Sequence, residues 1–295
     1  MPLTFLQIKH GENRIPRGEL WFGHGLFQGL GREDNLETRL RLCQELTMDI
    51  TFLPASISPY CSPLFNYRYF TLEEIKQAII TVENLAIGVI IDGPFQRLVH
   101  KEGFQSFMLR WRFPELQQIL VDEAAQVSQL VYACLECKPH TLIIADDIAY
   151  RQSTLVNVND LEQHLFVFYR DWIKEAHRHG IPVFFHSDGN LTGALPGLIT
   201  TGFDGLAGCE LECQDIPALK REYGQKLIFI TGIPAELMEC AELNSNHREE
   251  FIKLVVNLNS GGNFILGSSA GLASARQFAN LKILYRWADE IVIQK

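Results

Sequence analysis

Short apolar runs alternate with longer amphipathic segments along most of the chain. Eight such runs each end at a polar residue or at a turn that contains glycine or proline, and they cover 19–22, 50–53, 87–91, 141–145, 183–185, 203–207, 227–230 and 264–266. Uninterrupted runs of this length, bounded by turn residues, are typical of parallel strands that are buried on both faces.

Between these runs, apolar residues recur at three- and four-residue spacing, which predicts amphipathic helices. The expected helices cover 35–46, 71–82, 114–137, 159–179, 217–223, 247–258 and 274–291. Thr71 and Glu74 have the spacing of a capping box, which marks the start of the second of these helices.

Strands that alternate with helices of this length indicate βαβ units and a parallel sheet. Eight units in 295 residues predict an α/β fold, a (β/α)8 TIM barrel that forms a single domain over 1–295. A doubly wound open sheet is the alternative, but no glycine-rich dinucleotide fingerprint follows the first strand.

Composition narrows the classes of function. The formal net charge is -9 and no basic stripe is visible, which argues against nucleic-acid binding. No stretch reaches the roughly 18 to 20 apolar residues that a membrane helix needs, and 1–14 lack the pattern of a secretory signal. The seven cysteines, an odd number, favour a reduced, cytoplasmic protein. Cys134 and Cys137 form a CxxC inside an expected helix, where helix packing explains them better than zinc binding.

Polar residues follow the ends of several predicted strands. In a barrel these ends converge on one mouth, where catalytic groups are found, and the residues concerned are Asp92, Asp146, Asp147, His186, Asp188 and Glu210. Carboxylates gathered in this way need a compensating charge, or their pKa values rise. A bound cation, a cationic substrate, or the nearby Arg97 and Arg151 would supply it.

Each of these residues also has a purely structural interpretation. His186 could be a hydrogen-bonded histidine at a strand end, and Asp92, which precedes Gly-Pro, a turn aspartate. Asp146 and Asp147 could cap the following turn, and Glu210 could belong to a solvated acidic loop. Gly261 and Gly262, before the eighth strand, are more typical of a turn than of a phosphate site. The backbone amides of Gly267, Ser268 and Ser269, after that strand, are the better candidates for holding a phosphate.

Five short motifs, in this order, resemble the uroporphyrinogen decarboxylase superfamily: IDGPFQRLVHKEGF, ADDIAY, FFHSDGN, ALKREYG and GGNFILGSSAGL. The likeness extends from about Gly18 to the C-terminus, and the superfamily fold is a (β/α)8 barrel. The superfamily contains the decarboxylase itself and the corrinoid-dependent methyltransferases, such as the methylcobamide:coenzyme M methyltransferases.

The chain departs from the decarboxylase pattern at three places. No arginine-rich motif precedes Trp21, Ala55 and Ser56 stand near the position of an essential aspartate, and Ser268 or Ser269 replaces a histidine. A substrate with many carboxylates would also fit poorly in an acidic mouth. Porphyrinogen decarboxylation is therefore the weaker alternative, beside a non-catalytic module that binds a small molecule.

The resemblance to the methyltransferases implies a different site. Those enzymes hold zinc with a His-x-Cys and a later cysteine; here His186 matches the histidine, Asp188 stands at the first cysteine, and serine replaces the last. The related cobalamin-independent methionine synthases add a glutamate, which Glu210 matches in position. The expected ligands of zinc or another divalent metal are therefore His186, Asp188 and Glu210. The competing interpretation is that loss of both cysteines abolished metal binding and that Asp188 hydrogen-bonds a substrate.

The favoured function is methyl transfer between a small methylated compound, or a thiol or pterin acceptor, and a corrinoid carried by a partner protein. The expected catalytic residues are His186, Asp188, Asp146 and Asp147. The expected substrate-binding residues are Asp92, Arg97, Arg151, Ser268 and Ser269.

Overall fold

The computed structural model of this protein describes residues 14–56, 61–62, 67–269 and 271–291. Eight parallel strands form one sheet, in which hydrogen-bonded neighbours follow the order of the chain. They are β1 (Gly18–Glu19), β2 (Ile50–Pro54), β5 (Ala86–Asp92), β6 (Thr141–Ala145), β7 (Val183–His186), β8 (Gly205–Ala207), β9 (Ile228–Ile233) and β10 (Phe264–Ser268). The predicted α/β barrel is confirmed.

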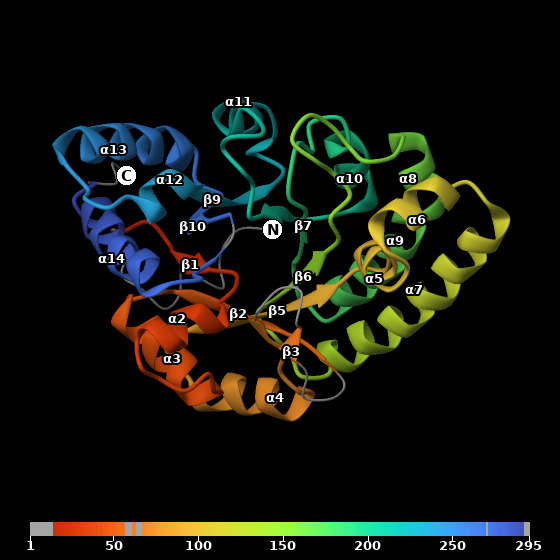
Figure 1. Ribbon diagram of the computed structural model, residues 1–295, viewed down its shortest axis with the longest axis horizontal. Coiled ribbons are helices and arrows are strands. Elements are labelled where there is room, and N and C mark those ends of the chain that lie inside the picture. Colours follow the sequence, from red (N-terminus) through yellow and green to blue (C-terminus); the bar gives the residue numbers. More distant parts are fainter. Residues whose placement is uncertain (1–13, 57–60, 63–66, 270, 292–295) are drawn as a thin grey trace.

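The two ends of the sheet come together beside β1 and β10. Arg17 forms a parallel bridge with Leu266, and the Leu266 amide donates to the Pro16 carbonyl at 2.7 Å. Figure 1 shows the resulting ring of strands with helices around it. Each predicted strand appears within a few residues of its expected position, because a fully buried parallel strand is marked by an unbroken apolar run.

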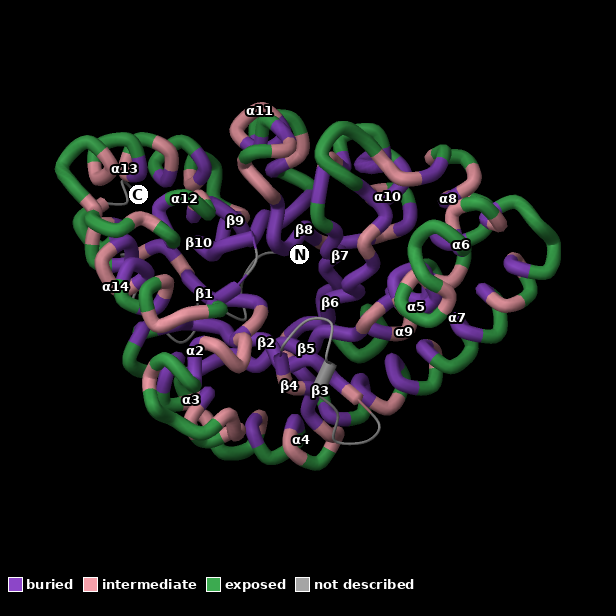
Figure 2. The backbone as a smooth tube through the Cα atoms, in the orientation of Figure 1, coloured by how far each residue is buried: buried purple, intermediate pink, exposed green. Residues whose placement is uncertain are grey.

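Thirteen helices cover the described part of the chain. They are α2 (His24–Gly29), α3 (Leu36–Glu45), α4 (Leu72–Thr81), α5 (Pro94–Glu102), α6 (Phe104–Arg110), α7 (Pro114–Leu135), α8 (Val158–His164), α9 (Phe166–Arg178), α10 (Leu195–Thr201), α11 (Ile216–Tyr223), α12 (Ala235–Glu239), α13 (Ser245–Asn259) and α14 (Ala275–Asp289). No helix in this part is long and apolar enough to cross a membrane. Figure 2 shows buried strands at the centre and exposed outer helix faces.

The helix predictions hold except in one place. The capping box of Thr71 and Glu74 is present at the start of α4. The helix expected over 159–179 is instead two helices, α8 and α9, which meet at Leu165, where φ is -118°. The short antiparallel hairpin of β3 (Cys61–Ser62) and β4 (Tyr67–Arg68) was not predicted.

Side chains alternate between the inside of the barrel and the layer of helices. Ile143 and Ala145 of β6 pack inside the barrel, whereas Leu142 and Ile144 pack against the helices. In β7, Phe184 points inward while Val183 and Phe185 point outward. Because side chains of a strand alternate with period two, this parity decides which polar residue beyond each strand faces the mouth.

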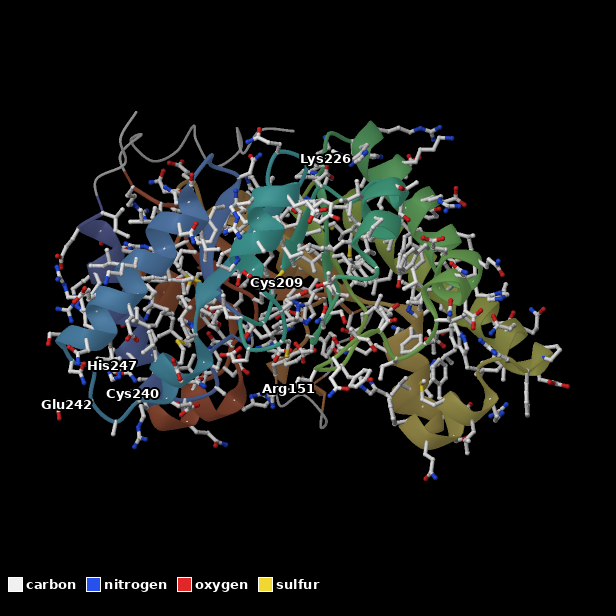
Figure 3. The ribbon with its side chains drawn as sticks, turned by 90° about the horizontal axis from the view of Figure 1, so that it is seen from above. Arg151, Cys209, Lys226, Cys240, Glu242 and His247 are labelled. Atoms are coloured by element: carbon white, nitrogen blue, oxygen red, sulfur yellow. The ribbon has the colours of Figure 1, made fainter. Side chains whose placement is uncertain are left out.

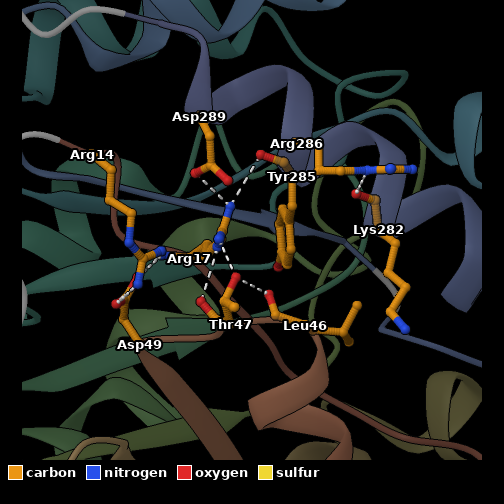
Figure 4. A network of polar contacts seen from close by, with 9 residues as sticks. All are labelled: Arg14, Arg17, Leu46, Thr47, Asp49, Lys282, Tyr285, Arg286 and Asp289. Atoms are coloured by element: carbon orange, nitrogen blue, oxygen red, sulfur yellow. Dashed lines mark hydrogen bonds and ion pairs between the residues drawn. The ribbon is translucent and has the colours of Figure 1, made fainter.

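A network of charges ties the amino-terminal ends of the strands together (Figure 4). The Arg17 guanidinium donates to Asp289 at 2.9 Å, to the Tyr285 carbonyl at 3.1 Å and to the Thr47 carbonyl at 3.0 Å. Asp49 accepts from the Arg17 amide at 2.9 Å and pairs with Arg14 at 2.5 Å. These contacts join the start of β1 to α14 and to the loop before β2.

Candidate active site

The mouth of the barrel lies at the carboxyl ends of the strands. Figure 3 shows Arg151, which follows β6, and Cys240, which follows β9, at one end of the molecule. Lys226, which precedes β9, lies at the opposite end. Each of the six polar residues expected at the mouth either ends a strand or follows its end, on the side of Arg151, but the structure gives them different roles.

His186 is the last residue of β7 and has the inward parity of Phe184. Its side chain is only 5% exposed, and its Nδ1 lies 2.8 Å from the Ala207 carbonyl. A carbonyl can only accept a hydrogen bond, so Nδ1 carries the proton in the neutral ring and Nε2 keeps its lone pair. A partner on the second ring nitrogen is the usual arrangement of a metal-binding histidine.

Two carboxylates face this Nε2. Oδ1 of Asp147 lies 3.8 Å from it and Oδ1 of Asp188 lies 3.7 Å from it. One ligand atom of each residue lies within 4.8 Å of the others, and this is the one such group found in the part of the chain that the structure describes. Ligand atoms about 2.1 Å from a tetrahedral metal are separated by ~3.4 Å, so the three atoms would have to move closer together to share one ion.

The loop after β7 holds the group together. The Asp188 amide donates to Asp147 Oδ1 at 3.0 Å, which fixes the two aspartates relative to one another. The pKa of Asp188 is raised to about 6, because its surroundings desolvate it and Asp147 and Glu210 repel its charge; His186 acts in the opposite direction. The Asp188 side chain is nevertheless 59% exposed, so water screens this repulsion.

Glu210, the third expected metal ligand, has a different role in this structure. Its Oε2 accepts from the Gly189 amide at 2.6 Å and from the Cys213 thiol at 3.2 Å. Glu210 therefore anchors the turn that carries Asp188, and Asp147 takes its place in the group of ligand atoms. The position of Glu210 after its strand was predicted correctly, but position alone did not indicate which groups its carboxylate contacts.

Asp146 was expected to be catalytic, yet it faces the helices. It shares the outward parity of Leu142 and Ile144, and it is fully buried. Its carboxylate accepts from the amides of Phe95 at 3.2 Å and Gln96 at 2.5 Å and from the Tyr169 hydroxyl at 2.6 Å. It thus caps the start of α5, and burial raises its pKa to about 7 despite these donors.

Asp92, the last residue of β5, accepts a short hydrogen bond from the Tyr69 hydroxyl. Desolvation raises the pKa of Asp92 to about 6, and the charge of Asp147 adds to this, while Tyr69 and Arg97 act against it. Asp92 is therefore a mouth carboxylate that is electrostatically coupled to Asp147.

Aromatic side chains that the sequence analysis did not select form another part of the mouth. Ring centroids are 6.1 Å apart for Trp21 and Tyr67, and 5.4 Å apart for Tyr67 and Tyr69. The Trp21 ring meets the His186 ring edge-on at 4.6 Å. The alternation of Tyr67 and Tyr69 was the available signal, because residues two apart in an extended segment share a face.

The remaining expected substrate-binding residues differ in their surroundings. Arg97 pairs with Glu123 of α7, and Arg151 is exposed. The Ser268 amide and hydroxyl both donate to Glu19, on the outward side of the barrel wall. Ser269 is 9% exposed. Of the expected substrate-binding residues, Arg97 and Ser268 thus bind other residues of the protein, whereas Asp92 is one of the residues at the mouth.

Comparison with known proteins gives likeness of structure only. No family model and no curated protein sequence matches the chain. A methyltransferase from Methanosarcina mazei superposes with a TM-score of 0.72 at 18% identity, over 98% of this chain and 97% of that one. A putative vitamin-B12 independent methionine synthase from Listeria monocytogenes gives 0.56 at 12% identity, over 95% and 97%.

A third solved structure is a 3-keto-D-glucoside 4-epimerase from E. coli. It superposes with a TM-score of 0.55 at 12% identity, over 92% of this chain and 98% of that one. At these identities the likeness establishes the barrel fold, which enzymes of different chemistry share. An assignment of function therefore has to rest on the residues of the mouth.

Proposed function

We propose that this protein is a methyltransferase of the corrinoid-dependent branch of the uroporphyrinogen decarboxylase superfamily. It would transfer a methyl group between a small methylated compound, or a thiol or pterin acceptor, and a corrinoid on a partner protein. The observation that carries the proposal is the group of His186, Asp147 and Asp188, in which one imidazole nitrogen and two carboxylates converge. The likeness in fold to a methyltransferase over 98% of the chain supports it.

The residues of this group suit a divalent metal. His186 turns its Nε2 toward the two aspartates, since its Nδ1 is engaged by the Ala207 carbonyl, and both aspartates offer hard oxygen ligands. Three protein ligands leave a position for a substrate. A metal bound there would hold an acceptor thiol as thiolate, because ligands bind in their deprotonated form. The Trp21 ring packs against His186 and orients the imidazole.

Methyl transfer then requires that the donor and the nucleophile meet in this mouth. The bond between the methyl carbon and its donor breaks, and its electron pair stays on the donor. The nucleophile supplies the electron pair of the new bond to carbon. The chain contributes by fixing both partners next to His186, since orientation lowers the barrier of a bimolecular step substantially.

The test is the metal content and methyl-transfer activity of protein purified without chelators. We expect His186→Ala to lose bound metal and methyl transfer while the barrel stays folded, as measured by elemental analysis, a methyl-transfer assay and circular dichroism. His164→Ala is the matched control, because His164 is an exposed histidine of α8. Full metal content in His186→Ala, or full activity in metal-free wild type, would contradict a catalytic metal.

A further inference from the structure

The loops that follow β6 and β7 leave the sheet side by side. Backbone amides of β6 that donate toward β7 belong to alternate residues, such as Leu142 and Asp146, and the Asp146 amide donates to the His186 carbonyl at 2.9 Å. Because the hydrogen bonds of a parallel pair are evenly spaced, the next one would join the Ile148 amide to the Asp188 carbonyl. A side-chain hydroxyl occupies this place instead.

Ser187 supplies this hydroxyl. Its Oγ accepts from the Ile148 amide at 3.1 Å and donates to the Asp188 carbonyl at 2.8 Å. The hydroxyl therefore bridges two backbone groups that would otherwise bond each other directly, and it holds them farther apart. Ser187 is only 1% exposed, and its proton and an acceptor site are both used within the protein. A serine that is buried in this way acts on the mouth through its neighbours.

The neighbours of Ser187 include both aspartates of the proposed metal group. Asp147 directly precedes Ile148, whose amide the hydroxyl binds, and Asp188 is the residue whose carbonyl it binds. The Asp188 amide donates in turn to Oδ1 of Asp147 at 3.0 Å, and this Oδ1 lies 3.8 Å from Nε2 of His186. The relative position of the two aspartates therefore depends on the Ser187 hydroxyl as well as on the Asp147 carboxylate.

Contacts beyond Ser187 hold the rest of these loops in place. The Asn190 amide donates to the Tyr150 carbonyl at 2.9 Å. Gly189 has φ +86°, and a Cβ there would lie 2.6 Å from the same carbonyl oxygen, so the two loops approach too closely for a larger residue. Loss of the Ser187 hydroxyl should therefore shift the backbone locally and leave the barrel folded.

We propose, on the basis of the divalent metal in the function above, that Ser187 is a positioning residue for the Asp147 and Asp188 carboxylates. Its hydroxyl keeps the loops after β6 and β7 in register, so that both carboxylates face Nε2 of His186. Without the hydroxyl, the Ile148 amide either bonds the Asp188 carbonyl directly or stays buried without an acceptor. In both cases the backbone that carries the carboxylates moves, and the metal is held less tightly.

The first test is the zinc affinity of Ser187→Ala, measured by calorimetric titration of metal-free protein. Loss of a group that orients metal ligands commonly weakens binding, so we expect zinc to bind at least about tenfold more weakly than in wild type. Circular dichroism should show that the barrel stays folded. A zinc affinity equal to that of wild type would overturn the proposal.

The matched control is Ser128→Ala, between α7 and α9 on the outside of the barrel. The Ser128 hydroxyl accepts from the Trp172 indole nitrogen at 2.8 Å and donates to the Ala124 carbonyl at 2.7 Å, which is the same pair of bonds. Its loss should lower the unfolding free energy and leave zinc affinity unchanged. If both variants weakened zinc binding alike, the effect of Ser187→Ala would reflect a general loss of stability, and the positioning role would be overturned.

Amide hydrogen exchange, followed by NMR in metal-free protein, separates this proposal from the proposed function. The Asp188 amide bonds Asp147 and not Ser187, so a serine that only satisfied its own partners would not affect the exchange of this amide. Ser187→Ala should speed this exchange at least about fivefold, about the effect of one lost hydrogen bond, and Ser128→Ala should not.

The two measurements together give separate outcomes. If wild type bound no zinc, the metal of the proposed function would be contradicted, and faster exchange of the Asp188 amide in Ser187→Ala would still support the positioning role. Unchanged exchange of this amide would overturn the role of Ser187 whether or not zinc binds.

Discussion

The two ends of the barrel differ in how their charged side chains are paired. At the amino-terminal end, Arg17 is 4% exposed and its guanidinium is satisfied by Asp289, Thr47 and the Tyr285 carbonyl, while Asp49 pairs with Arg14. At the mouth, Asp92, Asp147 and Asp188 gather around His186, and none of them pairs with a lysine or arginine among the described residues. A charge paired with an opposite charge stabilises the fold, whereas a group of like charges costs stability and is typical of a functional site.

The largest effect expected from this comparison is the loss of Arg17. Arg17→Met removes the cation and leaves the Thr47 and Tyr285 carbonyls without their donor, and breaking a buried ionic network costs about 3 to 4 kcal/mol. Urea denaturation should show this loss of unfolding free energy.

The control for Arg17 is Arg248→Met. Arg248 pairs with Glu290 at the surface, with side chains 43% and 50% exposed, so the same substitution should cost below about 1 kcal/mol. Equal costs for the two variants would show that the amino-terminal network does not hold the barrel closed.

The next effect concerns pH and Glu19, whose carboxylate is buried beside Ser268 and Tyr285. Burial raises the pKa of Glu19 from 4.5 to about 7. Because this folded-state pKa lies above the unfolded one, the contribution is fully present below about pH 4.5 and is lost as the pH rises through 7. It amounts to roughly 3 kcal/mol, at 1.36 kcal/mol per pKa unit.

The unfolding free energy of wild type and Glu19→Gln, measured from about pH 5 to about pH 8, tests this sign. Glutamine cannot ionise, so the variant should lose less stability than wild type over this interval. Parallel curves for the two proteins would mean that Glu19 titrates near its ordinary pKa in the folded state.

The comparison also shows which parts of the molecule can be predicted from the sequence. The strands were found because, in a protein with this alternation, an unbroken apolar run such as Thr141–Ala145 is typical of a buried parallel strand. Burial of this strand on both faces is also the reason why the different orientations of Asp146 and Asp147 could not be predicted. In a strand buried on both faces the apolar pattern does not indicate which face is the inside of the barrel, so the parity of its last residues stays undetermined.

Other parts of the site depend on contacts that are distant in sequence. Glu210 follows its strand as expected, but the Gly189 amide that engages it lies 21 residues away. Tyr69 and Asp92 are 23 residues apart and meet only because the hairpin folds beside β5. His186 and Asp188 could be predicted as site residues from the sequence, because a polar residue at the end of an apolar run in a barrel lies where the strands open into the mouth.

The smallest expected effect on stability comes from substitutions of the adjacent residues Asp146 and Asp147. They also give the most direct comparison between a carboxylate that faces the helices and one that faces the mouth. Asp146→Asn turns an amide group toward the donors from Phe95, Gln96 and Tyr169, and should cost about 2 kcal/mol of unfolding free energy. Asp147→Asn removes one of several repelling carboxylates, so it should change stability by less than about 0.5 kcal/mol in metal-free protein.

Metal binding should show the opposite order. Asp147 is 34% exposed and offers an oxygen to the group of His186 and Asp188, so Asp147→Asn should weaken zinc binding in calorimetric titration by at least about tenfold. Asp146→Asn should bind zinc as wild type does once it is folded, because the Asp146 carboxylate caps α5 and is not one of the metal ligands. If Asp146→Asn lost zinc binding and Asp147→Asn kept it, the assignment of these two residues to the wall and to the mouth would be reversed.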